Sequence, residues 1–261
     1  MQKTLILIGV LFLTACAGTQ EKDDTLGMSA QAIYQAAKEA GSDGTWDKAI
    51  QYYERLQARY PYGTYAQQAQ IEMCYAYWKD NEPQQALAAC EHFLKLHPNH
   101  PAVDYVLYLK GLINFNEDLG YVAYLGSPDP TERDPLAARE SYATFEELLR
   151  RFPNSQYAED AQKRVLYLRH AIAQQEVHVA RYYLKRKAYL AAANRAQMAL
   201  EKYPNTPATE EALYIMVLSY RALNLKDLEE DALRVMKHNY PKSAFYEKGI
   251  LDKPTPWWKL W

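Results

Sequence analysis

A short phrase built around proline recurs along the chain and restricts what it can fold into. RYPYGTYAQQA (59–69) and RFPNSQYAEDA (151–161) are nearly the same, and related phrases start at residues 96, 202 and 239. The prolines of the five phrases are Pro61, Pro98, Pro153, Pro204 and Pro241, spaced by 37, 55, 51 and 37 residues. Because proline lacks an N–H and clashes with the preceding turn, each phrase ends a helix. The chain is therefore expected to be a series of similar helical units.

Residues at fixed distances before these prolines identify the unit. Twelve residues before three of the prolines stand Ala49, Ala86 and Ala192, and twenty-one before three of them stand Tyr77, Tyr183 and Tyr220. Small residues where two helices touch and aromatic residues where they wedge apart resemble the tetratricopeptide pattern. No segment alternates polar and apolar residues with a period of two, so no sheet is expected. The prediction is an all-α, right-handed superhelical solenoid of five tetratricopeptide-like helical hairpins.

Start and stop signals place ten helices. Pro83, Pro135 and Pro207 are expected at first helical positions. The predicted helices cover residues 29–40, 45–59, 65–79, 83–96, 101–117, 135–151, 156–187, 188–202, 207–223 and 225–239. The range 156–187 would form a rod of about 48 Å, and the Gly- and Pro-containing segment 117–134 is expected to be a long surface loop.

The first residues have the pattern of a bacterial lipoprotein leader. Lys3 precedes a short apolar run, and Leu13-Thr14-Ala15-Cys16 resembles the lipobox. The prediction is a signal peptide over residues 1–15, lipidation of Cys16 and a flexible leash over residues 16–27. Ala17 after the cysteine indicates sorting to the outer membrane. The alternative is an ordinary signal peptide that happens to contain a cysteine.

Composition and motifs argue against several classes of function. The formal net charge is −2 and no cluster of basic residues exists, so no nucleic-acid binding is expected. The chain lacks the motifs of metalloproteases, serine hydrolases, nucleotide-binding loops and dinucleotide folds. His92, His97 and His100 could in principle bind a metal, but turn positions explain them better. The prediction is a protein that is not an enzyme and has no metal or cofactor.

Three groups of residues were considered for binding or cross-linking. Cys74 and Cys90 could form a disulfide, or could be two small residues buried at helix contacts. Tyr60, Tyr62 and Tyr65 crowd the first junction, where they could capture a peptide or simply pack. Trp257, Trp258 and Trp261 lie in the tail and could cap the last hairpin, contact a partner or contact lipid.

Longer segments resemble one family. The lipobox leader, WDKAIQYYERLQARYPYGTYAQQAQ, HPAVDYVLYLKGL, RDPLAARESYATFEELLRRFPNSQYAEDA and VARYYLKRKAYLAAANRAQMALEKYPNT occur in that order. Together they are similar to the BamD (ComL) lipoproteins of the outer-membrane β-barrel assembly machine, over roughly residues 30–225. The resemblance implies a lipid-anchored protein on the periplasmic face of the outer membrane.

The resemblance also implies partners and contact residues. Arg195 matches a basic residue that pairs with the POTRA domain of the barrel-forming subunit, and Arg195→Glu is expected to break that contact while leaving the fold intact. Tyr60 and Gly63 match a pocket for unfolded outer-membrane proteins. Other partners would be accessory assembly lipoproteins. The alternative is a periplasmic scaffold for peptidoglycan or DNA-uptake machinery.

The predicted organisation has five parts. After the leader and the leash, residues 28–155 hold repeats 1–3, residues 156–241 hold repeats 4–5, and residues 242–261 form a Trp-rich tail. The amino-terminal repeats would receive substrates and the carboxy-terminal repeats would bind the barrel-forming subunit.

Overall fold

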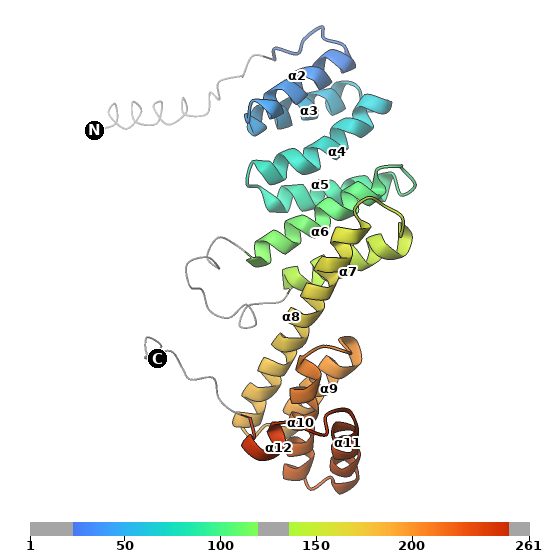
Figure 1. The fold of residues 1–261 in the computed structure, drawn as a ribbon. Coiled ribbons are helices and arrows are strands. Elements are labelled where there is room, and N and C mark those ends of the chain that lie inside the picture. Colours follow the sequence, from blue (N-terminus) through green and yellow to red (C-terminus); the bar gives the residue numbers. More distant parts are fainter. Residues whose placement is uncertain (1–22, 120–135, 251–261) are drawn as a thin grey trace, which may run out of the picture. The chain divides into compact units, whose positions relative to one another are not determined.

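The structure, a computed structural model, describes residues 23–119 and 136–250. These ranges contain only helices and the turns that join them (Figure 1). The helices are α2 (Ala30–Ser42), α3 (Trp46–Arg59), α4 (Thr64–Lys79), α5 (Pro83–Leu96), α6 (Val103–Leu119), α7 (Leu136–Arg151), α8 (Ala158–Lys185), α9 (Tyr189–Lys202), α10 (Ala208–Ala222), α11 (Lys226–Asn239) and α12 (Phe245–Lys248). The all-α class and the five tetratricopeptide-like hairpins, from α2–α3 to α10–α11, are confirmed for the described residues, while the superhelical hand stays a prediction.

The recurring prolines end the second helix of every hairpin. Helices α3, α5, α7, α9 and α11 each stop two residues before the proline, as predicted. The residue between helix and proline still donates its N–H to the helix, for example Tyr60 to the Leu56 carbonyl at 2.7 Å. It then turns to φ near −130° and ψ of 57 to 71° at Tyr60, His97, Tyr203 and Tyr240. A residue before proline avoids the helical region, so one backbone solution serves these junctions.

A second backbone motif closes the turn inside the hairpins. Gly44, Asn81, Lys187 and Asn224 all have positive φ, from 57 to 77°, and each stands two residues before the second helix. The next residue donates its N–H to a carbonyl five residues back, as Leu225 does to Tyr220 at 3.0 Å. This left-handed turn is the usual way to end a helix and reverse the chain. Glycine and asparagine suit it, whereas Lys187 does not.

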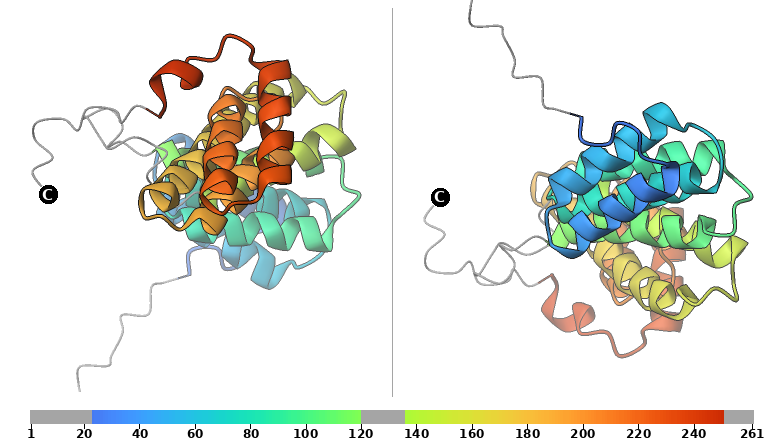
Figure 2. Two further views of the ribbon diagram at one scale, coloured as in Figure 1. Left: turned by 90° about the horizontal axis from the view of Figure 1, so that it is seen from below. Right: turned by 90° about the horizontal axis from the view of Figure 1, so that it is seen from above.

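The described chain divides into two compact units within α4, after Ala76. This boundary differs from the predicted division between residues 155 and 156. The first unit contains α2, α3 and most of α4. Its core is a cluster of apolar side chains from the three helices, including Ile33, Tyr53, Leu56 and Ala69. The pairing of α2 with α3 is visible in Figure 1 and in the right view of Figure 2.

In the second unit each helix from α5 to α10 packs against the next one along the chain. Close approach depends on small residues, as the sequence pattern predicted for Ala86 and Ala192, which are fully buried. Gly111 of α6 is the tightest case, because a Cβ atom there would lie 2.5 Å from the Phe145 ring of α7. The Ser141 hydroxyl of α7 donates to the Gly111 carbonyl at 2.8 Å. The left view of Figure 2 shows α10 and α11 side by side.

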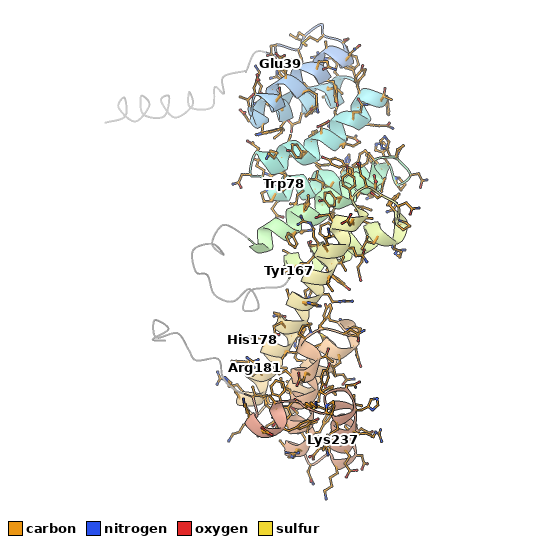
Figure 3. The ribbon with its side chains drawn as sticks, viewed as in Figure 1. Glu39, Trp78, Tyr167, His178, Arg181 and Lys237 are labelled. Atoms are coloured by element: carbon orange, nitrogen blue, oxygen red, sulfur yellow. The ribbon has the colours of Figure 1, made fainter. Side chains whose placement is uncertain are left out.

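Helix α8 is longer than its neighbours but shorter than expected. Its 28 residues give a length of about 42 Å, because it begins at Ala158, two residues after the predicted start, and ends at Lys185, two residues before the predicted end. Helix α8 packs on α7, α9 and α10. Arg181 of α8, labelled in Figure 3, pairs with Glu211 of α10 at 2.5 Å. The buried face includes Ala161, Leu168 and Ile172, and then moves to Ala173, Glu176, Val177 and Ala180.

Several predictions fall outside the described residues. They concern the leader, lipidated Cys16, the predicted loop over residues 117–134 from residue 120 onward, and the Trp-rich tail from residue 251 onward. Residues 117–119 of the predicted loop belong instead to α6. Over the two described ranges, none of the helices combines the length and apolar character that a membrane span requires.

Candidate binding surfaces

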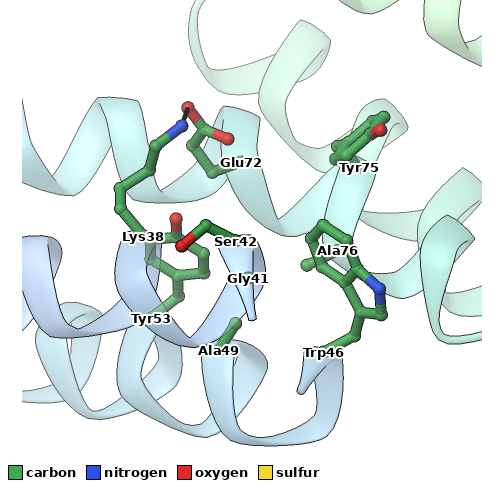
Figure 4. A pocket seen from close by; sticks show the side chains of 9 residues that line it. All are labelled: Lys38, Gly41, Ser42, Trp46, Ala49, Tyr53, Glu72, Tyr75 and Ala76. Atoms are coloured by element: carbon green, nitrogen blue, oxygen red, sulfur yellow. Dashed lines mark hydrogen bonds and ion pairs between the residues drawn. The ribbon is translucent and has the colours of Figure 1, made fainter. Parts of the chain in front are cut away.

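A pocket opens in the first unit between α2 and α4, with α3 beneath it (Figure 4). Its volume is about 190 Å³. The lining combines three aromatic side chains, three small residues and three polar ones: Trp46, Tyr53 and Tyr75; Gly41, Ala49 and Ala76; Lys38, Ser42 and Glu72. Sites for small molecules usually have about 300 to 1,000 Å³. This pocket therefore has room for one side chain rather than for a whole cofactor.

Aromatic packing and one ion pair shape the pocket. The Trp46 and Tyr75 rings meet edge to face at 5.6 Å between centroids. At the rim the Lys38 ammonium lies 3.0 Å from the Glu72 carboxylate, which also accepts a hydrogen bond from the Tyr34 hydroxyl at 3.4 Å. Burial and the nearby Glu72 charge raise the pKa of Tyr34 to about 12. Tyr34 is therefore a neutral hydrogen-bond donor at any physiological pH.

The four residues predicted to bind substrates lie in different surroundings. Tyr65 packs against Tyr34 with ring centroids 5.6 Å apart, so Tyr65 is linked to the pocket rim through Tyr34 and Glu72. The Tyr60 hydroxyl instead donates to the Met28 carbonyl at 2.9 Å. Tyr62 is 90% exposed, and Gly63 has a φ of 101° in the turn before α4. None of the four lines the pocket itself.

Residues 23–28, here named the N-terminal strap, are held against α3. The Arg59 guanidinium lies 2.8 Å from the Asp23 carboxylate and also donates to the Thr25 carbonyl. Arg55 and the Tyr52 hydroxyl each donate to Asp24 at 2.8 Å. The Thr25 side chain is fully buried. The predicted leash extended to residue 27, and its last five residues are thus part of the folded first unit.

In the second unit, Arg195 of α9 is paired with a buried acid. Its Nη1 atom lies 3.1 Å from the carboxylate of Glu176 on α8, and Arg139 of α7 contacts the other oxygen of the same carboxylate. Glu176 is 1% exposed, whereas the side chains of Arg139 and Arg195 are 41% and 39% exposed. A buried carboxylate needs such partners, because an unpaired charge would be costly to desolvate. The triad connects three consecutive helices, and both arginine side chains remain partly exposed.

This pairing changes the expectation for Arg195→Glu. The substituted carboxylate would lie beside buried Glu176, and like charges at that distance repel. The variant would therefore lose stability as well as any partner contact, so unchanged melting is no longer expected. A neutral polar substitution is the better probe of this surface.

The cysteines and histidines do not form a reactive centre in the described residues. Cys74 and Cys90 are both buried, and the disulfide that the sequence left open does not join them in the structure. The His97 and His100 rings lie beside Phe93, at 5.2 and 5.3 Å between centroids. Among the residues that the structure covers, no group of three or more His, Cys, Asp and Glu side chains could hold a metal ion.

Comparison with known proteins connects this architecture to a family. The model of YfiO, described as an outer membrane lipoprotein, matches residues 27–236. The chain belongs to this family. It is 44% identical to the outer membrane protein assembly factor BamD of Neisseria meningitidis serogroup B over 266 residues, which cover 100% of both chains. The BamD of Vibrio cholerae is 37% identical over 234 residues, covering 89% of this chain and 97% of that protein.

The tetratricopeptide domain of P58(IPK) is among the solved structures that this chain resembles. It aligns with 81% of this chain and 51% of its own, at 12% identity and a TM-score of 0.42.

Sequence reasoning missed the pocket, the strap and the buried acid. The pocket residues come from three helices, and no spacing within one segment brings Lys38, Trp46 and Glu72 together. The strap had a visible signal, because Arg55 and Arg59 are four residues apart on one helix face, with Asp23 and Asp24 upstream. Glu176 also had one, since a charged residue within the apolar face of α8 requires a partner.

Proposed function

We propose that the chain is a non-enzymatic lipoprotein subunit of the complex that assembles β-barrel proteins in the outer membrane. The observation that carries the proposal is 44% identity, over the full length of both chains, to a protein named as an outer membrane protein assembly factor. The subunit would be anchored through lipid on Cys16, at the periplasmic face of the outer membrane. Its partners would be the barrel-forming subunit, accessory lipoproteins and unfolded outer-membrane proteins.

The mechanism is binding and placement. One surface would hold a segment of the unfolded client and another would hold the barrel-forming subunit, so that the client is presented at high effective concentration. Support comes from the chemistry of the two surfaces: an aromatic pocket in the first unit, and half-exposed guanidinium groups in the second.

The client surface would be centred on the pocket between α2 and α4. A strand of a β-barrel presents alternating apolar side chains to lipid, and one aromatic side chain of such a strand would fit among Trp46, Tyr53 and Tyr75. Lys38 and Glu72 at the rim could bind the client backbone. Tyr65 extends this surface through its contact with Tyr34, while Tyr60, Tyr62 and Gly63 remain predicted contacts on the adjoining turn.

Filling the pocket tests the client surface. Ser42 lies at the pocket and is exposed, so Ser42→Leu can reduce the free space without disturbing the core. We expect affinity for a fluorescent peptide from the terminal strand of a client to fall about tenfold, which equals about 1.4 kcal/mol. Fluorescence anisotropy measures the affinity. Ala58→Leu adds similar apolar bulk to an exposed position of α3 and should leave it unchanged; equal weakening by both variants would contradict the assignment.

The Arg139–Glu176–Arg195 triad offers a matched test of the second surface. Arg195→Gln and Arg139→Gln each remove one guanidinium from the same carboxylate, and each should cost about 1 to 2 kcal/mol in the free energy of unfolding. Both variants should thus lose similar stability. If Arg195 also contacts the POTRA domain, Arg195→Gln should bind that domain more weakly than Arg139→Gln does. Binding is measured by calorimetry with the purified POTRA domain, and stability by urea titration. Equal affinity in the two variants would refute a contact by Arg195.

A further inference from the structure

The N-terminal strap fixes the point at which the chain enters the fold. Asp23 and Asp24 form ion pairs with Arg59 and Arg55 at 2.8 Å, and the Arg55 guanidinium is also 3.6 Å from Asp23. The Thr25 hydroxyl donates to Asp23 at 2.5 Å, and the Met28 carbonyl accepts the Tyr60 hydroxyl. These contacts hold both ends of the strap on the carboxy-terminal half of α3.

The chain between the strap and Cys16 is short. Cys16 stands seven residues before Asp23, so even a fully extended chain spans only about 25 Å. Helix α3 itself, with 14 residues, is about 21 Å long. If lipid is attached to Cys16, the end of α3 that binds the strap lies within about 25 Å of the bilayer surface, whereas the other end can lie up to one helix length farther away.

The same corner of the first unit exposes apolar side chains. Leu26 of the strap is 73% exposed and Tyr62, just after Tyr60, is 90% exposed. They are the two most exposed large apolar side chains in the described residues. Tyrosine and leucine suit the boundary between headgroups and hydrocarbon, where the tyrosine hydroxyl stays hydrated.

We propose that the N-terminal strap is a clamp that seats the first unit on the lipid surface, with the carboxy-terminal end of α3, Leu26 and Tyr62 facing the bilayer. The inference rests on the proposed lipidation of Cys16. It adds a second contact to the lipid anchor and gives the first unit a defined orientation. A free leash would allow every face of the unit to reach the membrane equally.

Charge determines which lipids this surface needs. Asp23 and Asp24 neutralise Arg55 and Arg59, so the corner carries no excess positive charge from these four residues. Attraction of basic residues to anionic lipid therefore adds little here. We expect the seating to be the same on neutral vesicles and on vesicles with added anionic lipid.

Depth measurements on the lipidated full chain test the clamp. A bimane label is placed at Ala58→Cys, near the strap, or at Asp43→Cys, in the turn at the opposite end of α3; both positions are exposed. Native Cys74 and Cys90 are buried, so they react slowly. On phosphatidylcholine vesicles with spin-labelled lipid, we expect strong quenching at position 58 and weak quenching at position 43, with or without phosphatidylglycerol.

Two variants separate the clamp from general charge effects. Asp23→Ala/Asp24→Ala releases the strap and should remove the difference in quenching between the two positions, while the protein still floats with vesicles. Glu39→Ala/Asp47→Ala removes the same charge from exposed sites of the first unit and should preserve the difference. Leu26→Ser/Tyr62→Ser should reduce quenching at position 58.

The possible outcomes distinguish the two proposals. Equal quenching at both positions of the otherwise unchanged chain, or a difference that survives release of the strap, overturns the clamp alone. Failure of the chain to float with vesicles overturns the lipid anchor and, with it, the clamp.

Discussion

Lys187 holds a backbone conformation that its side chain disfavours. Its φ of 60° is the one required by the left-handed turn inside the hairpin, where Gly44, Asn81 and Asn224 stand in three other repeats. A residue with a Cβ atom pays about 1 to 2 kcal/mol for this region, and asparagine pays less. The repeat thus tolerates a poor residue at one turn because the surrounding helices fix the conformation.

Lys187→Gly should stabilise the protein. We expect the free energy of unfolding to rise by about 1 kcal/mol, which corresponds to an increase of about 2 to 4 °C in the melting temperature for a chain of this size. Differential scanning calorimetry measures the change. Lys237→Gly, at an exposed position near the end of α11, should lower the melting temperature, since glycine weakens a helix. A fall in melting temperature for Lys187→Gly would show that the turn does not limit stability.

At the scale of elements, helix boundaries followed directly from the sequence. The second helices of all five hairpins end where the prolines predicted, because the stop is a local steric effect. The length of α8 was overestimated by two residues at each end, and at its carboxy-terminal end the helix stops before a turn at Lys187 that no glycine or asparagine indicates. The buried face of α8 also shifts along its length, since different neighbouring helices cover its two halves. A single row of apolar residues with helical spacing in the sequence does not predict this change of buried face along α8.

The contact between α6 and α7 depends on the absence of a side chain at Gly111. Gly111→Ala should reduce the free energy of unfolding by about 1 to 3 kcal/mol, because the new methyl group would overlap the Phe145 ring. Urea titration measures the loss. Phe145→Leu removes the overlapping atoms, so the double variant should show a favourable coupling of about 1 kcal/mol. Strict additivity of the two single changes would rule out the overlap as the cause.

At the scale of the whole molecule, the sequence predicted the repeat class and the family, whereas the pocket and the strap became visible only in the structure. The division after Ala76 lies inside α4, where no proline, glycine or change in composition marks it. Tyr60 also holds the strap, which the sequence did not indicate, because its hydroxyl donates to the Met28 carbonyl 32 residues away. Pairings over that distance leave no local spacing to detect.

The strap should respond to acid. The Thr25 hydroxyl and amide donate to Asp23 and, with Arg55 and Arg59, lower the pKa of Asp23 from its ordinary value of 3.8. A lowered pKa in the folded state means that the stabilisation is complete above the ordinary value and is lost as the pH falls through the lowered one. Protection of the Thr25 amide from hydrogen exchange should therefore persist from pH 7 to 4 and disappear at lower pH. In Asp23→Ala the protection should be absent at every pH.

The proline junctions have a consequence for how such a chain can change in size. Where each joint repeats the same pair of backbone angles, a segment of 37 residues, such as that between Pro61 and Pro98, can in principle be copied or removed without inventing a new connection. Adding one or more complete hairpins keeps the packing between adjacent hairpins the same. An insertion of a few residues, in contrast, must lengthen a helix or a loop. Chains of this family can thus change their number of hairpins in fixed increments.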